Sequence, residues 1–368
     1  MSIKKFQLKR WASLLLMAGL FMSAPPVAKT FAAEAWYPLE IDVWNPPFNS
    51  ERKRGSESYV PLEKADKAWK ICASIPHLKD PYWTAVNFGL IDQAKLMGVG
   101  LRLFEAGGYG NLETQQKQIR ECMATGADAL IIGGISAEGL NDLIEDYSGK
   151  GKVVVDMING INSPKLTARS GVDFWDMGLL TATYIREIEK SAKGPVKVGW
   201  FPGPKGAGWV SQGDKGFRKG LEGSNIEITT SANGDTGRAT QGELVKTALE
   251  TFKDLDYIVG TAVTANAAVD AIRRMGLTKK IKILSYYYGP GIHRGISRGN
   301  VIAAPTDLPA LQARMSVDTT VRALEKKSYF KHIGPKVIVV DRKNIKSFDA
   351  STSLPPRGFR PIFSVNDW

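Results

Sequence analysis

Residues 69–75 read Trp69-Lys-Ile-Cys-Ala-Ser-Ile75, a short run rich in apolar residues. A longer segment with helical spacing follows at 82–97, and another apolar run comes at 100–105. Short strand-like runs that alternate with longer helical ones are typical of parallel sheets covered by helices on both faces. This stretch therefore predicts an α/β fold in which the residues that follow each strand meet at one edge of the sheet.

The same alternation continues over most of the chain and predicts two doubly wound lobes. About ten strands are more than one such sheet usually contains, but they suit two sheets. The boundary between the two lobes falls near 171–175, after the polar stretch 159–170. Asn111 can cap the helix at 111–125, and the negative charge of Glu113 in the first turn interacts favourably with the positive end of the helix dipole. The other predicted strands are 128–132, 152–158, 195–201, 226–230, 256–260, 281–285, 301–304 and 335–340, and the other helices are 137–147, 176–192, 209–222, 238–253, 265–275 and 309–327.

The first 35 residues have the three parts of a secretory signal peptide. A basic start precedes an apolar run at 11–22 that is too short to span a bilayer, and small residues lead to Ala33 and Ala35, after either of which cleavage could occur. The alternative is a retained membrane anchor. No later stretch resembles a membrane span, so we expect a soluble periplasmic protein. Removing five basic residues and one acidic residue with this segment lowers the formal charge from +12 to +8.

Aromatic residues recur just beyond the predicted strands. Trp83, Trp175 and Trp209 fall at such positions, as do Tyr109 and the run 286–288. A single tryptophan there would most often pack the core. Several at equivalent strand ends predict a cleft with aromatic walls between the two lobes.

The motifs that resemble catalytic or cofactor sites lack the context that such sites need. Gly295-Ile-Ser-Arg-Gly299 matches the nucleophile elbow G-x-S-x-G, but a helical turn precedes Ser297 and a strand follows it, which is the reverse order. The glycine-rich segment 203–208 lacks the spacing of a phosphate loop. The three histidines have no metal-binding spacing. We therefore expect no enzyme activity, no cofactor and no metal.

Two further features concern charge and redox state. The clusters 52–54 and 279–280 are basic, but they lack the interleaved aromatic residues of a single-strand binder, and export argues against nucleic acid as a partner. In an oxidising compartment the isolated pair Cys72 and Cys122 is a candidate disulfide, and two buried thiols are the alternative.

Several segments carry a resemblance to a known family. They are Trp69-Lys-Ile-Cys72, Leu78-Lys-Asp-Pro-Tyr-Trp83, Glu105-Ala-Gly-Gly-Tyr109 with Gln115-Gln116, Pro202-Gly-Pro204, Gly260-Thr-Ala262, Arg294-Gly295 and Arg357-Gly-Phe-Arg-Pro361. With these segments the chain resembles the ribose-binding type (type 1) of periplasmic binding proteins. It is most similar to the periplasmic sensors of trimethylamine-N-oxide respiration.

The resemblance implies an architecture with several boundaries. After the signal peptide (1–35) we expect an N-terminal arm (36–68), an N-terminal lobe (69–173 and 301–330) and a C-terminal lobe (174–300 and 331–368). A three-segment hinge would join the lobes near 171–175, 290–305 and 328–334. Both cysteines match cysteines of the family, which favours the disulfide.

The resemblance also implies a ligand and a set of residues that bind it. Trimethylamine N-oxide has a cationic methylated head, which aromatic faces attract. The aromatic box would consist of Trp83, Tyr109, Phe174 or Trp175, and Tyr287 or Tyr288. The family's aromatic near the lobe junction could align with either Phe174 or Trp175. Departures from the family pattern here, at Trp209 and at 286–288 could reshape the pocket for another methylated amine, an aromatic compound or a sugar.

Two polar residues distinguish these ligands. Asp307, just beyond the strand 301–304, is the best-placed carboxylate, although it could instead be a helix cap before Pro309. A sugar would depend on hydrogen bonds from Asp307 and Asn266. A methylated amine would depend on the aromatic faces.

Three roles remain open from the sequence. The first is a ligand sensor that closes its lobes on a solute and signals to the periplasmic domain of a membrane histidine kinase. The second is the solute-binding component of an ABC transporter for a sugar or a small amine, which would dock on a permease. The third is a secreted hydrolase that uses Ser297, against which the reversed motif argues.

Overall fold

The largest of the three sheets in the described residues lies at the centre of the N-terminal lobe. We obtained a computed structural model of the chain, which describes residues 36–366 and 368; the predicted signal peptide lies outside these residues. Six parallel strands of the sheet stand in the order β4-β3-β5-β6-β7-β13, and its three other strands pair antiparallel at the two edges. The parallel strands are β3 (Lys70–Ile75), β4 (Gly100–Glu105), β5 (Ala129–Ile132), β6 (Val153–Met157), β7 (Ala168–Ser170) and β13 (His332–Pro335).

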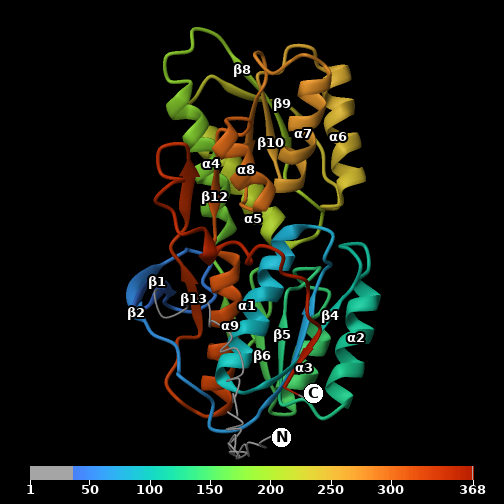
Figure 1. The fold of residues 1–368 in the computed structure, drawn as a ribbon, viewed down its shortest axis with the longest axis vertical. Helices are drawn as coiled ribbons and strands as arrows, with labels where there is room; N and C mark the ends of the chain where they lie inside the picture. Colours follow the sequence, from blue (N-terminus) through green and yellow to red (C-terminus); the bar gives the residue numbers. More distant parts are fainter. Residues whose placement is uncertain (1–35, 367) are drawn as a thin grey trace, which may run out of the picture. The chain divides into compact units, whose positions relative to one another are not determined.

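Helices cover both faces of this sheet, as Figure 1 shows. Ile71, Ala73 and Ile75 of β3 point into the core formed with α1 and α9, whereas Cys72 points to the other face, which packs against α2 and α3. This alternation follows from the two-residue period of a strand. The helices of this lobe are α1 (Pro81–Met97), α2 (Leu112–Ala124), α3 (Asn141–Gly149) and α9 (Pro309–Leu324).

The start of α1 is fixed by three consecutive residues. Asp80 is the N-cap, and its side chain accepts a hydrogen bond from the backbone N–H of Tyr82 at 3.0 Å. Pro81 occupies the first turn, where a missing N–H costs nothing. This cap holds Tyr82 and Trp83 at the carboxyl end of β3, which is the edge where ligands bind in such sheets.

The C-terminal lobe contains a smaller sheet in which all strands are parallel. Its order is β11-β10-β8-β9. The strands are β8 (Val196–Phe201), β9 (Ile226–Ser231), β10 (Tyr257–Gly260) and β11 (Lys282–Ser285), and the helices are α4 (Phe174–Ile188), α5 (Gly208–Leu221), α6 (Arg238–Thr251), α7 (Ala262–Arg274) and α8 (Pro290–Arg298).

The chain passes between the lobes more often than the three-segment hinge predicts. It crosses at 171–173 and again at 307–308, where Leu308 has a positive φ of 54°. It then crosses between β13 (His332–Pro335) and β14 (Ile338–Asp341), and a last time before β15 (Ser364–Val365). Gln312 links the first two crossings, because its carboxamide accepts from the N–H of Val172 at 3.1 Å and donates to the carbonyl of Asp307 at 2.7 Å.

These crossings correct the expected division of the C-terminal third. β13 and β15 pair within the nine-stranded sheet, so parts of 331–368 that we assigned to the C-terminal lobe belong to the N-terminal one. The strand β12 (Ala303–Thr306), assigned to the N-terminal lobe, pairs with β14 in a separate two-stranded sheet that packs beside β11 and α4. The expectation was wrong because residues 301–341 alternate between the lobes.

The N-terminal arm is also more regular than expected. Its strands β1 (Leu39–Trp44) and β2 (Arg54–Tyr59) form an antiparallel hairpin that joins the large sheet through β13. The hairpin also reaches the C-terminal lobe, because Arg54 forms an ion pair with Asp176 of α4 at 2.5 Å. The arm is therefore an integral part of residues 37–368, which form one compact unit.

A disulfide joins Cys72 of β3 to Cys122 of α2, with Cα atoms 6.1 Å apart. This confirms the pairing that the resemblance implied. A bridge that closes a loop of this length stabilises a fold by about 2–4 kcal/mol, mainly by restricting the unfolded chain. No helix in residues 36–366 is both long and apolar enough to cross a bilayer.

Candidate ligand-binding site

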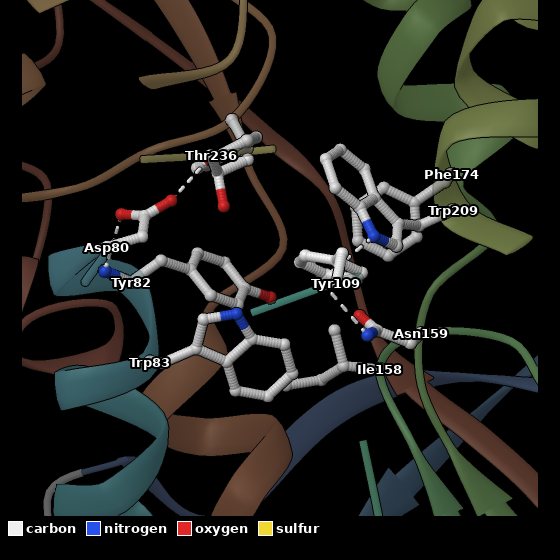
Figure 2. Close-up of a pocket in the computed structure, with 10 residues that line it drawn as sticks. Asp80, Tyr82, Trp83, Tyr109, Ile158, Asn159, Phe174, Trp209 and Thr236 are labelled. Carbon is white, nitrogen blue, oxygen red and sulfur yellow. Dashed lines mark hydrogen bonds between the residues drawn. The ribbon is translucent and has the colours of Figure 1, made fainter. Parts of the chain in front are cut away.

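A small cavity lies where the strand ends of the two lobes face each other. Its cavity volume is about 20 Å³, which is little more than the space that one water molecule needs. The lobes therefore leave little free space between them in this closed arrangement, which favours a small solute. Its lining, of which Figure 2 labels all but Tyr287, consists of Asp80, Tyr82, Trp83, Tyr109, Ile158 and Asn159 from the N-terminal lobe, and Phe174, Trp209, Thr236 and Tyr287 from the C-terminal lobe.

Aromatic rings from both lobes form most of the wall. The ring centroids of Tyr109 and Trp209 are 6.0 Å apart, and those of Phe174 and Trp209 are 5.9 Å apart. Tyr82 packs edge to face against Trp83 at 5.6 Å and against Tyr287 at 5.3 Å. Aromatic faces carry a negative quadrupole, so a wall of this kind attracts a cationic group.

The hydroxyl of Tyr109 is oriented by two donors. It accepts a hydrogen bond from Nδ2 of Asn159 at 3.1 Å and one from Nε1 of Trp209 at 3.0 Å. Among the described residues no acceptor takes its own proton. Burial raises the pKa of Tyr109 far above its usual value, so the phenol stays neutral. Tyr109 can therefore donate a hydrogen bond to an oxygen atom inside the cavity.

Asp80 supplies the carboxyl group of the cavity. Besides capping α1, it accepts a hydrogen bond from the hydroxyl of Tyr287, across the two lobes. Burial raises the pKa of Asp80 to about 6, although these two hydrogen bonds counteract the rise. At neutral pH the group is therefore mostly ionised, and it places a negative charge beside the aromatic rings.

A second set of contacts closes the lobes beside the cavity. Lys79 forms an ion pair with Asp235 at 2.9 Å, and Nε2 of His77 lies 2.9 Å from the hydroxyl oxygen of Thr236. Burial lowers the pKa of His77 to about 4, so its ring is neutral near pH 7. Thr236 is thus held at the cavity wall by the opposite lobe.

The structure brings together four of the residues that the sequence predicted. Trp83, Tyr109, Phe174 and Tyr287 all line this cavity. Between the two neighbours at the start of α4, Phe174 is the one that faces the cavity. Trp175 does not, because its ring lies under the guanidinium of Arg52, at 4.5 Å from the ring centroid.

Three other predicted residues lie elsewhere. Tyr288 is buried against Phe348, and its hydroxyl bonds with Nδ1 of His293 at 2.6 Å. Asp307 lies behind the wall, where it accepts a hydrogen bond from the hydroxyl of Tyr82 at 2.5 Å. Asn266 is exposed in the second turn of α7 and lines a different groove.

The sequence reasoning did not include six lining residues in the predicted set. Asp80 carries a visible signal, because an Asp before a Pro at the start of a helix is a typical cap. Trp209 and Asn159 lie just beyond predicted strands, and Tyr82 adjoins Trp83 in the same segment. Ile158 and Thr236 have no signal beyond their position after a strand. The six residues are Asp80, Tyr82, Ile158, Asn159, Trp209 and Thr236.

Two motifs that resemble reactive sites have structural roles. Ser297 is exposed in α8, and its hydroxyl donates to the carbonyl of His293 at 2.8 Å, while Gly299 ends the helix in the left-handed region. Residues 203–208 form the connection from β8 to α5. In the part of the chain that the structure describes, no three His, Cys, Asp or Glu side chains are grouped as a metal site would need.

Comparisons with known proteins agree with this geometry. A family model described as a periplasmic binding protein domain matches residues 71–328. The curated periplasmic protein TorT of Escherichia coli strain K12 is 34% identical over 307 residues, which cover 83% of this chain and 87% of TorT.

Two solved structures are similar in sequence as well as in fold. An ABC transporter solute-binding protein from Bradyrhizobium sp. BTAi1, with bound bis-tris, is 46% identical, with a TM-score of 0.78 and coverage of 89% of this chain and 98% of that one. The complex of the TorS sensor domain with TorT in the presence of TMAO matches at 32% identity, with a TM-score of 0.73 and coverage of 80% and 99%.

Proposed function

The chain belongs to the periplasmic binding protein family, as a TorT-like member of the periplasm, and from this premise we propose that it senses a small methylated amine. Trimethylamine N-oxide is the solute that we propose, and a membrane histidine kinase is the partner that receives the signal. Members of this family are binding proteins and not enzymes.

One observation carries the proposal: a small cavity whose wall combines aromatic rings with a single carboxyl group, that of Asp80. Rings and a carboxylate complement a cationic head that offers no hydrogen bonds of its own. A sugar needs several polar partners at its hydroxyl groups. The residues that we expected to supply them, Asp307 and Asn266, do not line the cavity.

The remaining polar groups suit the other end of the solute. Trimethylamine N-oxide carries a negative oxygen opposite its three methyl groups, and the available proton of Tyr109 could bind that oxygen. Two relatives support this chemistry. TorT has been crystallised with TorS in the presence of TMAO, and the protein from Bradyrhizobium holds bis-tris, which is a tertiary amine.

The signal would arise from closure of the lobes. Asp80 and Tyr287 lie in different lobes and bond across the cavity, as do Tyr109 and Trp209. A solute that contacts both lobes binds the closed form better than the open form, and it shifts the population by that difference in affinity. A partner that contacts both lobes would then detect the closed form.

Titration calorimetry of the mature chain tests the ligand class. The panel contains trimethylamine N-oxide, tetramethylammonium, bis-tris and D-ribose. We expect trimethylamine N-oxide to bind most tightly and ribose to give no heat of binding. Tight binding of ribose, with no binding of any amine, would contradict the proposal.

A second role is favoured by the relative from Bradyrhizobium, which is described as an ABC transporter component. In that role the closed chain would deliver an amine to a permease. The two roles separate in an assay with the periplasmic domain of the histidine kinase encoded nearest to this chain. Ligand-dependent binding to that domain supports the sensor, whereas loss of amine uptake on deletion of the gene supports the transporter.

A further inference from the structure

A second and larger groove crosses the boundary between the lobes, away from the aromatic cavity. Its volume is about 470 Å³. Lys79 and Pro81 line it from the N-terminal lobe, and residues of α6, α7 and α8 line it from the C-terminal lobe. Figure 1 shows α1, which begins at Pro81, with the N-terminal lobe, and α7 and α8 with the other.

The lining of this groove carries more positive than negative side chains, although Lys79 is paired with Asp235 at 2.9 Å. Its lining contains four basic side chains, Lys79, Arg238, Arg294 and Arg298, and one acidic side chain, Asp270. Asp270 already interacts with Arg238 at 3.5 Å and with Arg273, which lies outside the lining, at 3.2 Å.

Two of these arginines have no counter-charge. Arg294 and Arg298 are exposed on α8, and neither forms an ion pair with any described residue. They are four residues apart on one helix face, an arrangement of like charges that destabilises a helix. The positive field is also felt nearby, because Arg294 helps burial to lower the pKa of His293. Arg298 lies in the last turn of α8, where a positive charge stabilises the helix, but Arg294 has no such position, so stability of the free chain does not explain Arg294.

The arrangement matches an occupant with several carboxylates in a row. Arginine binds carboxylates through paired hydrogen bonds, and an acidic protein segment could reach Arg294 and Arg298 together. Lys79 moves with the N-terminal lobe, whereas the arginines move with the C-terminal lobe. An occupant that contacts all three would therefore meet the complete set only when the lobes are closed.

We propose that this groove, built around Lys79, Arg294 and Arg298, is the docking surface for an acidic segment of the protein that receives the signal. The identity of that receptor, a histidine kinase, rests on the proposed function. The receptor would then bind the closed form best, because only closure brings these three basic side chains together.

The test measures binding of the kinase's periplasmic domain to the ligand-saturated chain. Charge reversal in R294E/R298E should weaken binding roughly tenfold to a hundredfold, as expected for lost charge pairs at an interface, and R294Q/R298Q should fall between it and the parent. The matched control R120E/K215E changes the net charge equally at two exposed sites that form no ion pair with any described residue, and it should bind like the parent.

Two readouts keep the outcomes distinct. Each variant should retain the parent's melting temperature and its calorimetric affinity for trimethylamine N-oxide. If the parent itself does not bind the kinase domain, the proposed function fails. If the parent binds and R294E/R298E binds equally well, the docking surface is wrong. A loss of binding to anionic phospholipid vesicles, with kinase binding unchanged, would also overturn the docking proposal.

Discussion

The two lobes contribute different chemistry to the same cavity. Both supply rings, but the carboxyl group and the oriented hydroxyl come from the N-terminal lobe. There, Asp80 is held by its role as a helix cap, and Asn159 is held by the carbonyl of Gly134 at 2.7 Å. The C-terminal lobe adds mainly Phe174, Trp209 and Tyr287. The difference suggests that the first lobe orients the solute and the second covers it with aromatic faces.

The largest effect is expected from removing the charge that the N-terminal lobe supplies to the cavity. Asp80→Asn removes the negative charge but keeps the shape of the side chain and an acceptor for Tyr287. We expect the affinity for a methylated ammonium solute to fall by about 2–5 kcal/mol, or at least roughly thirtyfold. Calorimetry measures the change.

Asp307→Asn is the matched control for this variant. Asp307 is equally buried, and burial raises its pKa to about 6 as well, but it lies behind Tyr82 and not at the cavity. Its substitution should alter the affinity only slightly. If both variants weaken binding equally, the carboxylate of Asp80 has no special contact with the solute.

The raised pKa of Asp80 also predicts an effect on stability. A carboxyl whose pKa is higher in the folded state binds protons more readily there, so its ionisation costs folding free energy as the pH rises from about 4 to about 6. Because the pKa of Asp80 differs by about two units between the unfolded and the folded chain, its ionisation lowers the free energy of unfolding by about 3 kcal/mol. Asp80→Asn should therefore be more stable than the parent at pH 7, and the difference should vanish near pH 4.

Denaturant unfolding of the parent and the variant across this pH range provides the measurement. The comparison is needed because His77 and His332 have lowered pKa values and act in the opposite direction. An equal stability of both proteins at pH 7 would show that Asp80 ionises in the folded state as easily as in water.

The next prediction concerns the aromatic cover of the C-terminal lobe. Trp209→Ala removes a ring from the cavity wall and a donor to Tyr109. A desolvated cation–π contact is worth about 2 kcal/mol, so we expect binding of the solute to weaken roughly thirtyfold. Trp175→Ala, in the ring that packs against Arg52, should leave the affinity unchanged. If Trp175→Ala weakened binding more than Trp209→Ala, the solute would bind beside Trp175 and not in this cavity.

The smallest effect concerns the contacts that close the lobes. Lys79 and Asp235 form a partly exposed ion pair between them, and such pairs contribute about 0.2–1 kcal/mol. Lys79→Ala should therefore weaken solute binding only a few-fold, by favouring the open form. Asp235→Asn should have the same effect, and the double variant should add little to either. Strictly additive losses would mean that the two side chains act separately.

The sequence predicted most of the parallel strands well, because these are short apolar runs between helical segments. It did not predict β2, whose residues are almost all exposed and which forms only because β1 offers a partner. The alternation of β1 is visible in Leu39-Glu-Ile-Asp-Val-Trp44, but six residues without a predicted partner strand are too few to predict a hairpin. β7 and β15 are too short to show a period.

The site was predicted in part for similar reasons. Strand ends located Trp83, Tyr109 and Tyr287, because parallel strands bring these positions to one edge. Choosing between Phe174 and Trp175 requires the rotation of a helix, since neighbouring residues differ by about 100° around its axis. Asp307 was misplaced because β12 runs to Thr306 and the chain then turns through Leu308 into the hinge.

The charge of the solute's head offers the most direct test of the account. tert-Butyl alcohol has nearly the shape of trimethylamine N-oxide but carries no charge, so both can be titrated into the parent and into Asp80→Asn. We predict that the parent binds trimethylamine N-oxide at least roughly thirtyfold more tightly than the alcohol, and that the preference largely disappears in the variant. Equal affinities of the parent for the two solutes would contradict the claim that this cavity recognises a cationic head.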